Sequence, residues 1–567
     1  MCSRPSPEGG SAPLDFVAAL NSWRSRFGSD RVLDGAGARS HYGDDTIGHS
    51  RAVLAALLIR ERSEVSAALE IARLHRVPLY PISTGHNWGY GGASPVVDGC
   101  VILDLSRMNR IIEMDRELGL VTLEPGVTQG QLRAYLDRHA ADFMVPTTGA
   151  GPNCSLIGNA LERGYGITPH ADHFGAVTAL EAVLPDGRLY RSALAELGVE
   201  SVDQAFKWGL GPYLDGLFAQ GSVGVVTQMT IALARRPERV EAFFFGIAED
   251  GGLESAVAAV QGILRTLGGT VGAINLMNAR RVLAMTVAYP ADRVGSDGVL
   301  PAEIVSDLAR RHQVRAWMGV GALYGDSRVV KAARAVVRQF LRPVADRIMF
   351  ITPERSALLG RLVRSAPVLS RIAEVFGVAN VAGLLQAIHQ SLDVMAGRPS
   401  EVALGLAYWR TGRPPREGAL NPAADACGLI WYSPLVLMKP GAVRNYVTMV
   451  HEVCVAHGIE PLITLTSLTD RCFDSTVPLL FDRGDAGQAA RAGACFDALF
   501  EAGREQGCIP YRLGIQSMRR ATGMRSPFWD LVGTIKAAID PDRIIAPGRY
   551  APVPASASQL PAPERAE

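Results

Sequence analysis

The chain has 567 residues, with 57 Lys and Arg against 56 Asp and Glu, so its formal net charge is +1 at pH 7. Hydrophobic residues make up 48% and charged residues 20%, which is typical of globular proteins and excludes wholesale disorder. A near-neutral charge argues against nucleic acid or anionic lipid as the main partner. The length predicts two or three packed lobes.

In chain order, apolar periodicity, turn residues and caps predict alternating helices and strands. The first part is expected to contain a helix at 64–75, strands at 79–82, 101–105, 111–114 and 121–123, a Thr-capped helix at 128–139, a hairpin at 179–191 and a strand at 223–233. After about residue 241 we expect alanine-rich helices mixed with strands such as 428–432, and then a helix at 527–539. The fold class is therefore α+β, and the final 50-odd residues rejoin the first lobe.

The cysteines and the apolar runs bear on the compartment. The 8 cysteines form no C-x-x-C pair, so neither a zinc site nor a thioredoxin-like motif is indicated. Scattered cysteines in a long chain are typical of free thiols in a reducing compartment. The apolar run at 53–59 is far too short to cross a bilayer, and the N-terminus lacks the apolar core of a signal peptide. We expect a cytoplasmic protein without a membrane partner.

Two loops are rich in glycine. The first reads STGHNWGYGG at 83–92 and the second GAGPNCSLIGNA at 149–160. Glycine lets successive backbone N–H groups point to one side and approach a phosphate closely. Neither loop is the G-x-G-x-x-G of a Rossmann turn, so a nicotinamide dinucleotide is not favoured. Ordinary turns are the alternative interpretation of both loops.

Five ordered segments extend this argument. They read YPISTGHNWGYGGASP, VTLEPGVTQGQL, SLIGNALERGYGITPHADHFG, GLGPYLDGLFAQGSVGVVTQMTI and DPDRIIAPGRY. In order and spacing they resemble the vanillyl-alcohol oxidase/4-cresol dehydrogenase flavoproteins over nearly the whole chain. The resemblance implies an N-terminal extension at 1–45, a PCMH-type FAD-binding domain at 46–238, an α+β substrate (cap) domain at 239–509, a C-terminal segment at 510–550 that completes the FAD domain, and a disordered tail at 551–567.

The resemblance also implies which residues bind FAD, and no metal. These are Ser83, Thr84, Gly85, His86, Asn87, Gly89, Cys154, Ser155, Gly158, Asn159, Gly164, Gly166, Asp172, His173, Val225 and Arg549. Asp172 and His173 are expected to fix their loop near the flavin.

The usual flavin anchor of the family is absent. Its relatives attach the flavin through a His or Tyr of the substrate domain, whereas the corresponding stretch here, 470–478, contains neither. His86 and Cys154 resemble the two flavin-bound residues of berberine-bridge-type enzymes, which link to the 8α-methyl and the 6-position. Covalent attachment through both is one hypothesis. The alternatives are a phosphate-loop donor for His86 and a small buried side chain for Cys154.

The substrate site is expected at Tyr511 and Arg512, which resemble the Tyr-Arg pair over the phenolic oxygen of vanillyl-alcohol oxidases, with Tyr90 as a second tyrosine. A guanidinium and phenol hydroxyls stabilise a phenolate. The family's acidic residue is missing from the loop at 146–151, and His170 is a candidate acid or base, with a backbone-bonded loop histidine as the alternative. Trp431 and Tyr432 are expected either to line the pocket or to pack in the core.

These features predict an FAD-dependent oxidase or dehydrogenase that transfers hydride from a phenolic or benzylic compound, of the 4-alkylphenol or aryl alcohol type, to flavin N5. Its partners would be a small-molecule substrate and O2 or another electron acceptor, and a homodimer stays open. One alternative is a berberine-bridge-like oxidase of an alcohol, sugar, amine or bulky specialised metabolite. Another is a catalytically impaired flavin-binding scaffold.

Overall fold

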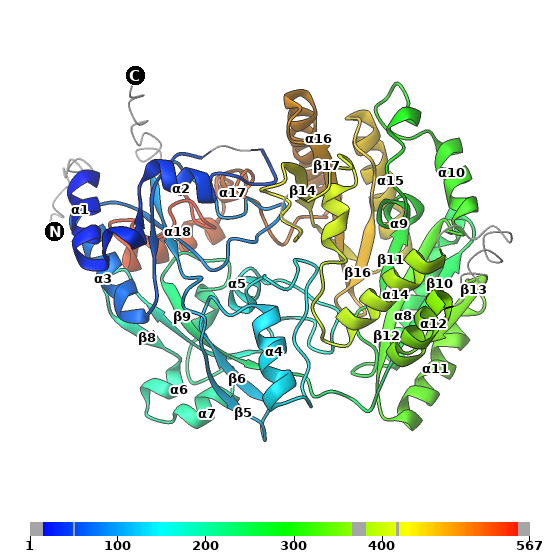
Figure 1. The fold of residues 1–567 in the computed structure, drawn as a ribbon, viewed down its shortest axis with the longest axis horizontal. Helices are drawn as coiled ribbons and strands as arrows, with labels where there is room; N and C mark the ends of the chain where they lie inside the picture. Colours follow the sequence, from blue (N-terminus) through cyan, green and yellow to red (C-terminus); the bar gives the residue numbers. More distant parts are fainter. Residues whose placement is uncertain (1–14, 49–50, 366–380, 416–418, 554–567) are drawn as a thin grey trace, which may run out of the picture.

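The computed structural model describes residues 15–48, 51–365, 381–415 and 419–553. They form two lobes side by side, one built from the two ends of the chain and the other from its middle (Figure 1). The tails expected to be disordered, the opening ten or so residues and 551–567, lie outside the described residues except for 551–553. In the described part, no helix is long and apolar enough to cross a membrane.

The first lobe begins with a four-stranded sheet in the order β1-β2-β4-β3. Its strands are β1 (Val32–Leu33), β2 (Val53–Leu58), β3 (Leu79–Ile82) and β4 (Cys100–Asp104), and its helices are α1 (Phe16–Phe27), α2 (Gly35–Tyr42) and α3 (Arg62–His75). β2, β3 and β4 run parallel. The run at 53–59 is thus a buried strand, which explains why it is almost wholly apolar.

Residues 15–45, expected to belong to a separate N-terminal extension at 1–45, are part of this lobe. β1 pairs with β2, and the indole of Trp23 on α1 donates a hydrogen bond to the carbonyl of Ala68 on α3. Ala19, Trp23 and Phe27 are buried on one face of α1 because they recur every four residues. This apolar stripe attaches residues 15–45 to the sheet.

A second sheet of the first lobe has five strands in the order β5-β6-β9-β7-β8, all antiparallel. They are β5 (Ile111–Asp115), β6 (Leu120–Leu123), β7 (Val177–Val183), β8 (Leu189–Arg191) and β9 (Val225–Ala232). With it belong α4 (Gln129–His139), α5 (Leu156–Leu161), α6 (Ala193–Glu196) and α7 (Glu200–Ala205). Thr128 caps α4 through a capping box, as its sequence predicts.

The second lobe is built on an eight-stranded sheet in the order β13-β10-β12-β11-β16-β17-β14, with β15 paired to β17. The strands are β10 (Arg239–Ile247), β11 (Asn275–Asn278), β12 (Trp317–Gly325), β13 (Arg347–Ile351), β14 (Cys427–Tyr432), β15 (Leu435–Leu437), β16 (Thr464–Ser467) and β17 (Cys472–Asp482). The helices are α8 (Leu253–Thr266), α9 (Ala279–Thr286), α10 (Ala302–Arg311), α11 (Ser327–Leu341), α12 (Pro353–Ser365), α14 (Val381–Met395), α15 (Pro440–Ala456) and α16 (Ala486–Glu505). Apolar side chains of α8, α11, α15 and α16 share one core with one face of the sheet, and the other face is turned to the first lobe.

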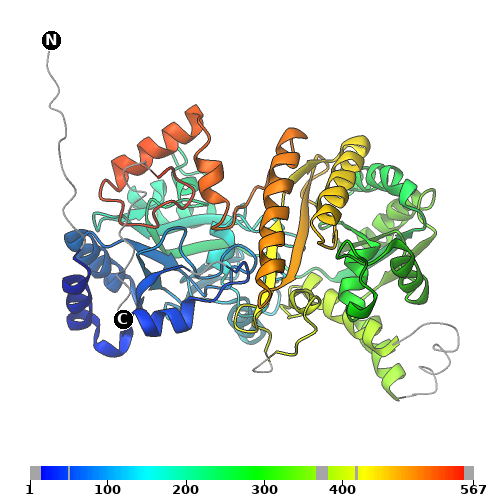
Figure 2. The ribbon, with the colours of Figure 1, turned by 90° about the horizontal axis from the view of Figure 1, so that it is seen from above.

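After α16 the chain returns to the first lobe through α17 (Met518–Thr522) and α18 (Pro527–Ile539) (Figures 1 and 2), and Ile535 and Ile539 of α18 pack against the core of the five-stranded sheet. The backbone of Leu79 on β3 accepts a hydrogen bond from Ala546 and donates one to Ile544 at 2.7 Å. The buried ammonium of Lys536 binds Asp540 and the carbonyl of Ser222. The C-terminal segment is thus tied to both sheets of the first lobe.

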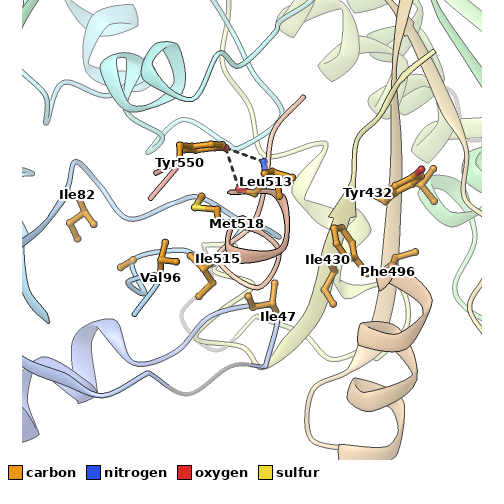
Figure 3. Close-up of a cluster of buried hydrophobic side chains, with 14 of the residues drawn as sticks. Ile47, Ile82, Val96, Ile430, Tyr432, Phe496, Leu513, Ile515, Met518 and Tyr550 are labelled. Atoms are coloured by element: carbon orange, nitrogen blue, oxygen red, sulfur yellow. Dashed lines mark hydrogen bonds between the residues drawn. The ribbon is translucent and has the colours of Figure 1, made fainter. Parts of the chain in front are cut away.

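The junction of the lobes is apolar (Figure 3). Leu513, Ile515 and Met518 of the returning segment lie between Ile82 of the first lobe and Ile430 of the second. The hydroxyl of Tyr550 accepts a hydrogen bond from the backbone N–H of Leu513 at 3.0 Å. The returning segment therefore packs against both lobes and fixes their relative position.

Candidate functional site

A cavity of about 1030 Å³ lies between the lobes. Its walls come from both glycine loops, from α5, from the inner face of the large sheet and from the returning C-terminal segment. The predicted site residues that line it are Ser83, Thr84, Gly85, His86, Asn87, Tyr90, Cys154, Ser155, Gly158, Asn159, Gly164, Gly166, Val225, Tyr511, Arg512 and Arg549.

The first glycine loop has the backbone of an anion-binding nest. In the part of the chain that is described, no acceptor is found for the backbone N–H groups of residues 84–87. Gly85 has a φ of +70°, which lets neighbouring N–H groups turn to one side. A Cβ at Gly158 of the second loop would lie 2.4 Å from Oγ of Ser83. These features fit the diphosphate of FAD, held by backbone N–H groups and by loops that only glycine lets approach.

His86 and Cys154 lie on facing loops and both border the cavity. His86 Nδ1 is 3.1 Å from the carbonyl oxygen of Asn153, and its ring stacks on Trp88 with centroids 4.9 Å apart. Burial lowers the pKa of His86, so the imidazole is neutral and nucleophilic at pH 7. Burial raises the pKa of the Cys154 thiol to about 11, against a smaller lowering by Arg512. The thiol is protonated and less reactive in this environment.

Asp172 and His173 support the second loop and do not line the cavity. His173 Nδ1 is 2.5 Å from Oδ1 of Asn159, and burial lowers the pKa of His173 to about 4, so the ring is neutral. A Cβ at Gly166 would lie 2.6 Å from His173, and one at Gly164 would lie 2.2 Å from Asn159. Asp172 accepts a hydrogen bond from a backbone N–H three residues later. The His-Asn pair therefore positions glycines that reach the cavity.

Tyr90, Tyr511 and Arg512 come together from opposite ends of the chain. The guanidinium carbon of Arg512 lies 4.4 Å from the ring centroid of Tyr90, and Nη2 donates to Oδ1 of Asn87 at 2.5 Å. The hydroxyls of Tyr90 and Ser433 are 2.8 Å apart. Burial raises the pKa of Tyr90 to about 12 and that of Tyr511 well above its ordinary value. Both phenols are protonated at neutral pH and can donate hydrogen bonds to an anion.

The backbone at the lobe junction sets the position of Tyr511. Its N–H donates to the carbonyl of Ser433, and its carbonyl accepts from the side-chain amide of Gln220 at 2.9 Å. The ring of Tyr165 meets the Tyr511 ring edge-on at 5.5 Å. Tyr511 is thus held by backbone and side-chain groups from both lobes, and its ring packs against that of Tyr165.

Glu162, which the sequence did not single out, is the counter-ion of this region. Its carboxylate is buried, pairs with Arg549 and lies 3.6 Å from Nε of Arg512. Burial by itself raises the pKa of Glu162, but Arg549 and Arg512 outweigh it and hold the pKa below its ordinary value. Two guanidiniums share this one carboxylate, which leaves a positive excess beside the cavity.

Asp474 is a second acid that the sequence did not single out. It is buried on β17, lines the cavity, and its Oδ1 has no hydrogen-bond partner. Burial raises its pKa to about 7, and Arg512 acts in the opposite direction. The charge of Asp474 contributes to the raised pKa of Tyr511 and of Tyr90, so it lies among the same groups. A carboxyl with this pKa can both accept and donate a proton at neutral pH.

Strand alternation decides which residues of the large sheet face the cavity. On β17, Asp474 and Thr476 line it, whereas Phe473 and Val477 belong to the core beneath. On β14, Trp431 lines the cavity, and Tyr432 points to the opposite face (Figure 3). Trp431 thus joins the pocket, and Tyr432 packs in the core.

Two other predicted residues do not join the site. His170 is exposed on its loop and does not line the cavity, so we assign it no catalytic role. Gly89 lies beneath the indole of Trp431, where a Cβ would come within 2.2 Å of the ring. Its part is to allow this contact between the lobes, and it does not line the cavity.

A signal for Asp474 was present in the sequence. By resemblance, the stretch 470–478 corresponds to the place where relatives attach the flavin, and Asp474 is the acid inside its strand. Alternation alone leaves open which of the two faces points to the cavity. For Glu162 there was no comparable signal, because its partners Arg512 and Arg549 lie far away in the sequence.

Comparisons with known proteins agree with this geometry. Residues 53–193 match a family described as FAD binding domain. The chain is 36% identical to 1'-carboxy-chondrochloren decarboxylase of Chondromyces crocatus, covering 94% of this chain and 96% of that protein. It is 28% identical to the flavoprotein subunit of 4-cresol dehydrogenase [hydroxylating] of Pseudomonas putida, covering 94% and 95%.

Solved structures share the whole fold. P-cresol methylhydroxylase with substrate bound matches with a TM-score of 0.82 and 25% identity, covering 95% of this chain and 97% of that one. The 4-ethylphenol oxidase from Gulosibacter chungangensis matches with a TM-score of 0.84 and 22% identity, covering 97% and 99%. Both lobes, and their arrangement, are therefore common to these proteins.

Proposed function

This chain belongs to the vanillyl-alcohol oxidase/4-cresol dehydrogenase family of FAD-dependent oxidoreductases, and we propose that it oxidises a phenol at the side-chain carbon attached to the ring. When bound, FAD supplies the acceptor for the hydride that leaves this carbon. The single observation that carries the proposal is the convergence of Tyr90, Tyr511 and Arg512 on one wall of the cavity.

These three residues have the chemistry to hold a phenolate. Arg512 is a permanent cation, and the two protonated tyrosines donate hydrogen bonds without competing for the negative charge. Ionising the phenol pushes electron density through the ring towards the side-chain carbon attached opposite the hydroxyl, which makes loss of a hydride from that side-chain carbon easier. The positive excess around Glu162 favours the same ionisation.

Asp474 is our candidate for the proton-transfer group. The acid that the family carries in the loop at 146–151 is missing here. Asp474 approaches from the substrate lobe, and its pKa of about 7 suits a group that takes up and returns a proton. We propose that Asp474 accepts the phenolic proton while Arg512 stabilises the anion that is left.

The cofactor is proposed to lie against the two glycine loops. Residues 84–87 would hold its diphosphate, and His86 and Cys154 would face the flavin ring from neighbouring loops. Covalent links at these two side chains remain our hypothesis. The electron acceptor that reoxidises the flavin, O2 or another compound, and a homodimer are part of the same proposal.

A second candidate reaction is oxidative decarboxylation, which the 36% identical decarboxylase favours. In a phenol with a carboxylate on the second side-chain carbon, loss of a hydride from the first carbon gives a quinone methide. Cleavage of the bond to the carboxylate then releases CO2, and its electron pair forms a new C=C bond as the ring returns to a phenolate. This route needs no water-activating acid, which fits the loop at 146–151.

The test is anaerobic mixing of the holoenzyme with 4-alkylphenols while the visible flavin absorbance is followed. We expect bleaching by phenols and none by sugars. Arg512→Ala should slow the bleaching about 100- to 1000-fold, the range for loss of a preorganised charge partner, and Tyr511→Phe should slow it less. Tyr135→Phe, on α4 away from the cavity, is the matched control. Unchanged reduction in both site variants would refute the phenolate site.

A further inference from the structure

Arg281 is an unpaired cation on the cavity wall. It lies in the first turn of α9, where its backbone N–H donates to Oδ1 of the capping residue Asn278. The Nε and Nη1 atoms of its side chain are buried and have no hydrogen-bond partner. Within the described ranges no carboxylate forms an ion pair with it, whereas Arg280 next to it is paired with Glu460. The side chain borders the cavity.

An arrangement of this kind is unfavourable unless a ligand completes it. Burial lowers the pKa of Arg281 to about 10, so the guanidinium is still charged at neutral pH. Charges taken out of water are normally paired and hydrogen-bonded, because desolvation is not otherwise compensated. The side chain borders the cavity, so an anion that enters the cavity can supply the missing partner.

The position of Arg281 separates it from the phenol-binding group. Asn275 on β11, Thr466 on β16 and Asp474 on β17 form one row across the sheet, because Asn275 pairs with Thr466 and Thr466 pairs with Asp474. β11 runs away from that row and leads directly into α9, so Arg281 lies beyond the opposite end of the strand. The next row of the sheet, between these groups and α9, holds Met277, Thr464 and Thr476. The cavity lining also includes the apolar side chains of Val282, Met318, Leu404 and Trp431.

We propose that Arg281 binds a carboxylate at the far end of the substrate, so that the enzyme acts on phenols that carry a carboxylate on an apolar chain. This inference rests on the proposed phenol site and adds the class of substrate. The planar fork of a guanidinium matches one carboxylate in a bidentate pair. Such a substrate would place its phenol group at Arg512, its apolar chain along the sheet and its carboxylate at Arg281. Both guanidiniums would then face a negatively charged group.

Binding of non-oxidisable probes to the holoenzyme tests this proposal. ω-(4-Hydroxyphenoxy)alkanoates of increasing chain length have an oxygen in place of the carbon attached to the ring, so no hydride can leave. Their amides are the neutral counterparts, and binding is followed through the change in the visible flavin spectrum. We expect one chain length at which the acid binds at least about tenfold more tightly than the amide, the effect of a new charge-assisted pair.

Arg281→Met should weaken binding of that acid about thirtyfold or more and leave the amide unchanged, since one partner of a buried charge pair is removed. The affinity of Arg281→Lys for the acid should lie between those of the wild type and of Arg281→Met. Arg347→Met is the matched control, because it removes the same charge from an exposed residue at the rim of the same cavity. The Arg281→Met holoenzyme without probe should melt at the same temperature or higher, since an uncompensated buried charge is lost.

Other results overturn the inference. One such result is that the wild type binds acid and amide with equal affinity at every chain length, and another is that Arg281→Met weakens the binding of both equally. Either result would show that Arg281 does not bind the carboxylate. A lowered flavin content or melting temperature in Arg281→Met would show instead that Arg281 has a structural or cofactor role. If neither acid nor amide perturbs the flavin at all, the phenol site itself fails, which is a different outcome.

Discussion

At the scale of single residues, the site depends on charges that lie outside water. Arg512 has Glu162, Tyr90 and Asn87 around it, so its guanidinium is fixed before a substrate arrives. Asp474 has no such partner for its Oδ1, and burial raises its pKa to about 7 although Arg512 acts in the opposite direction. The site thus combines a permanent cation with an acid that changes its charge near neutral pH.

Asp474→Asn tests the acid. In the wild type, flavin reduction by a 4-alkylphenol should speed up as the pH rises through about 7, because the ionised carboxylate is the proton acceptor. In the variant this inflection should vanish and the rate should fall about 100-fold or more, the usual contribution of general acid–base catalysis. Stopped-flow absorbance across pH measures both. An inflection that survives in the variant would assign it to another group.

The same substitution has a predictable effect on stability. The folded carboxyl has a raised pKa, so between the ordinary value of 3.8 and about 7 the folded protein holds a proton that the unfolded chain has released. Stability from this group is present at low pH and is lost as the pH rises to about 7. Asp474→Asn should therefore melt higher than the wild type above pH 7, and the advantage should shrink towards pH 4. Thermal unfolding of both proteins at several pH values measures how the difference in melting temperature changes with pH.

The two candidate anchors give a direct chemical test. If His86 and Cys154 both bind the flavin, acid-precipitated wild-type protein should stay yellow, and peptide mapping should find flavin on both loops. His86→Ala and Cys154→Ala should each keep one link, and the double variant should release intact FAD. Release of all flavin from the wild type would leave His86 with the role of a loop residue bonded to Asn153.

At the scale of elements, the C-terminus of α5 is joined to the returning segment through Glu162. Its carboxylate binds Arg549 and approaches Arg512, and the hydroxyl of Tyr550 lies 3.4 Å away. These contacts connect a short helix of the first lobe to residues almost four hundred positions later. The connection is buried, so the pair is far more sensitive to loss of one partner than a surface pair is.

Glu162→Gln should therefore destabilise the protein by about 3–5 kcal/mol, because two buried guanidiniums lose their counter-charge. Chemical unfolding followed by circular dichroism measures the change in the free energy of unfolding.

Glu501→Gln is the control for Glu162→Gln. Its carboxylate pairs with Arg504 while both side chains are about half exposed, and such surface pairs contribute about 0–1 kcal/mol. If the two variants lose the same amount, the buried cluster has no special role in joining α5 to the C-terminal segment.

At the scale of the whole molecule, the first lobe is not complete without the distant C-terminal segment. β3 pairs with residues 544–546, and the apolar junction in Figure 3 draws on both lobes and on the returning segment. The cavity has walls from all three. Binding of FAD and the packing of the two lobes should therefore fail together.

Truncation tests this dependence. A chain that ends at residue 539 lacks the pairing of 544–546 with β3 and lacks Arg549, and it should be purified without FAD or in aggregated form. A chain that ends at Val553 keeps every described C-terminal residue and should retain FAD and the melting temperature of the full chain. Absorbance at visible wavelengths and a thermal scan report both. Normal flavin content in the chain that ends at residue 539 would show that FAD binding does not require the C-terminal segment.

Local patterns in the sequence predict most of the helices and strands. The helix at 527–539 and the strand at 79–82 have the predicted bounds, and the Thr128 cap begins α4 as expected. These features depend on neighbours in the chain, namely caps, prolines and apolar spacing. The local pattern at 1–45 does not predict its place in the first lobe, because Trp23 binds Ala68 on α3 and β1 pairs with β2, and both partners lie further along the chain.

By itself, the sequence determined the α+β class, the family, the FAD cofactor and most of the residues that line the cavity, because loops of glycine and short ordered motifs are local properties of the chain. Only the tertiary structure decided that Glu162 and Asp474 line the cavity, that His170 does not, and that among the described residues Arg281 has no carboxylate partner. Burial and pairing set the pKa and the chemistry of a side chain, and both depend on residues that folding brings together from distant positions.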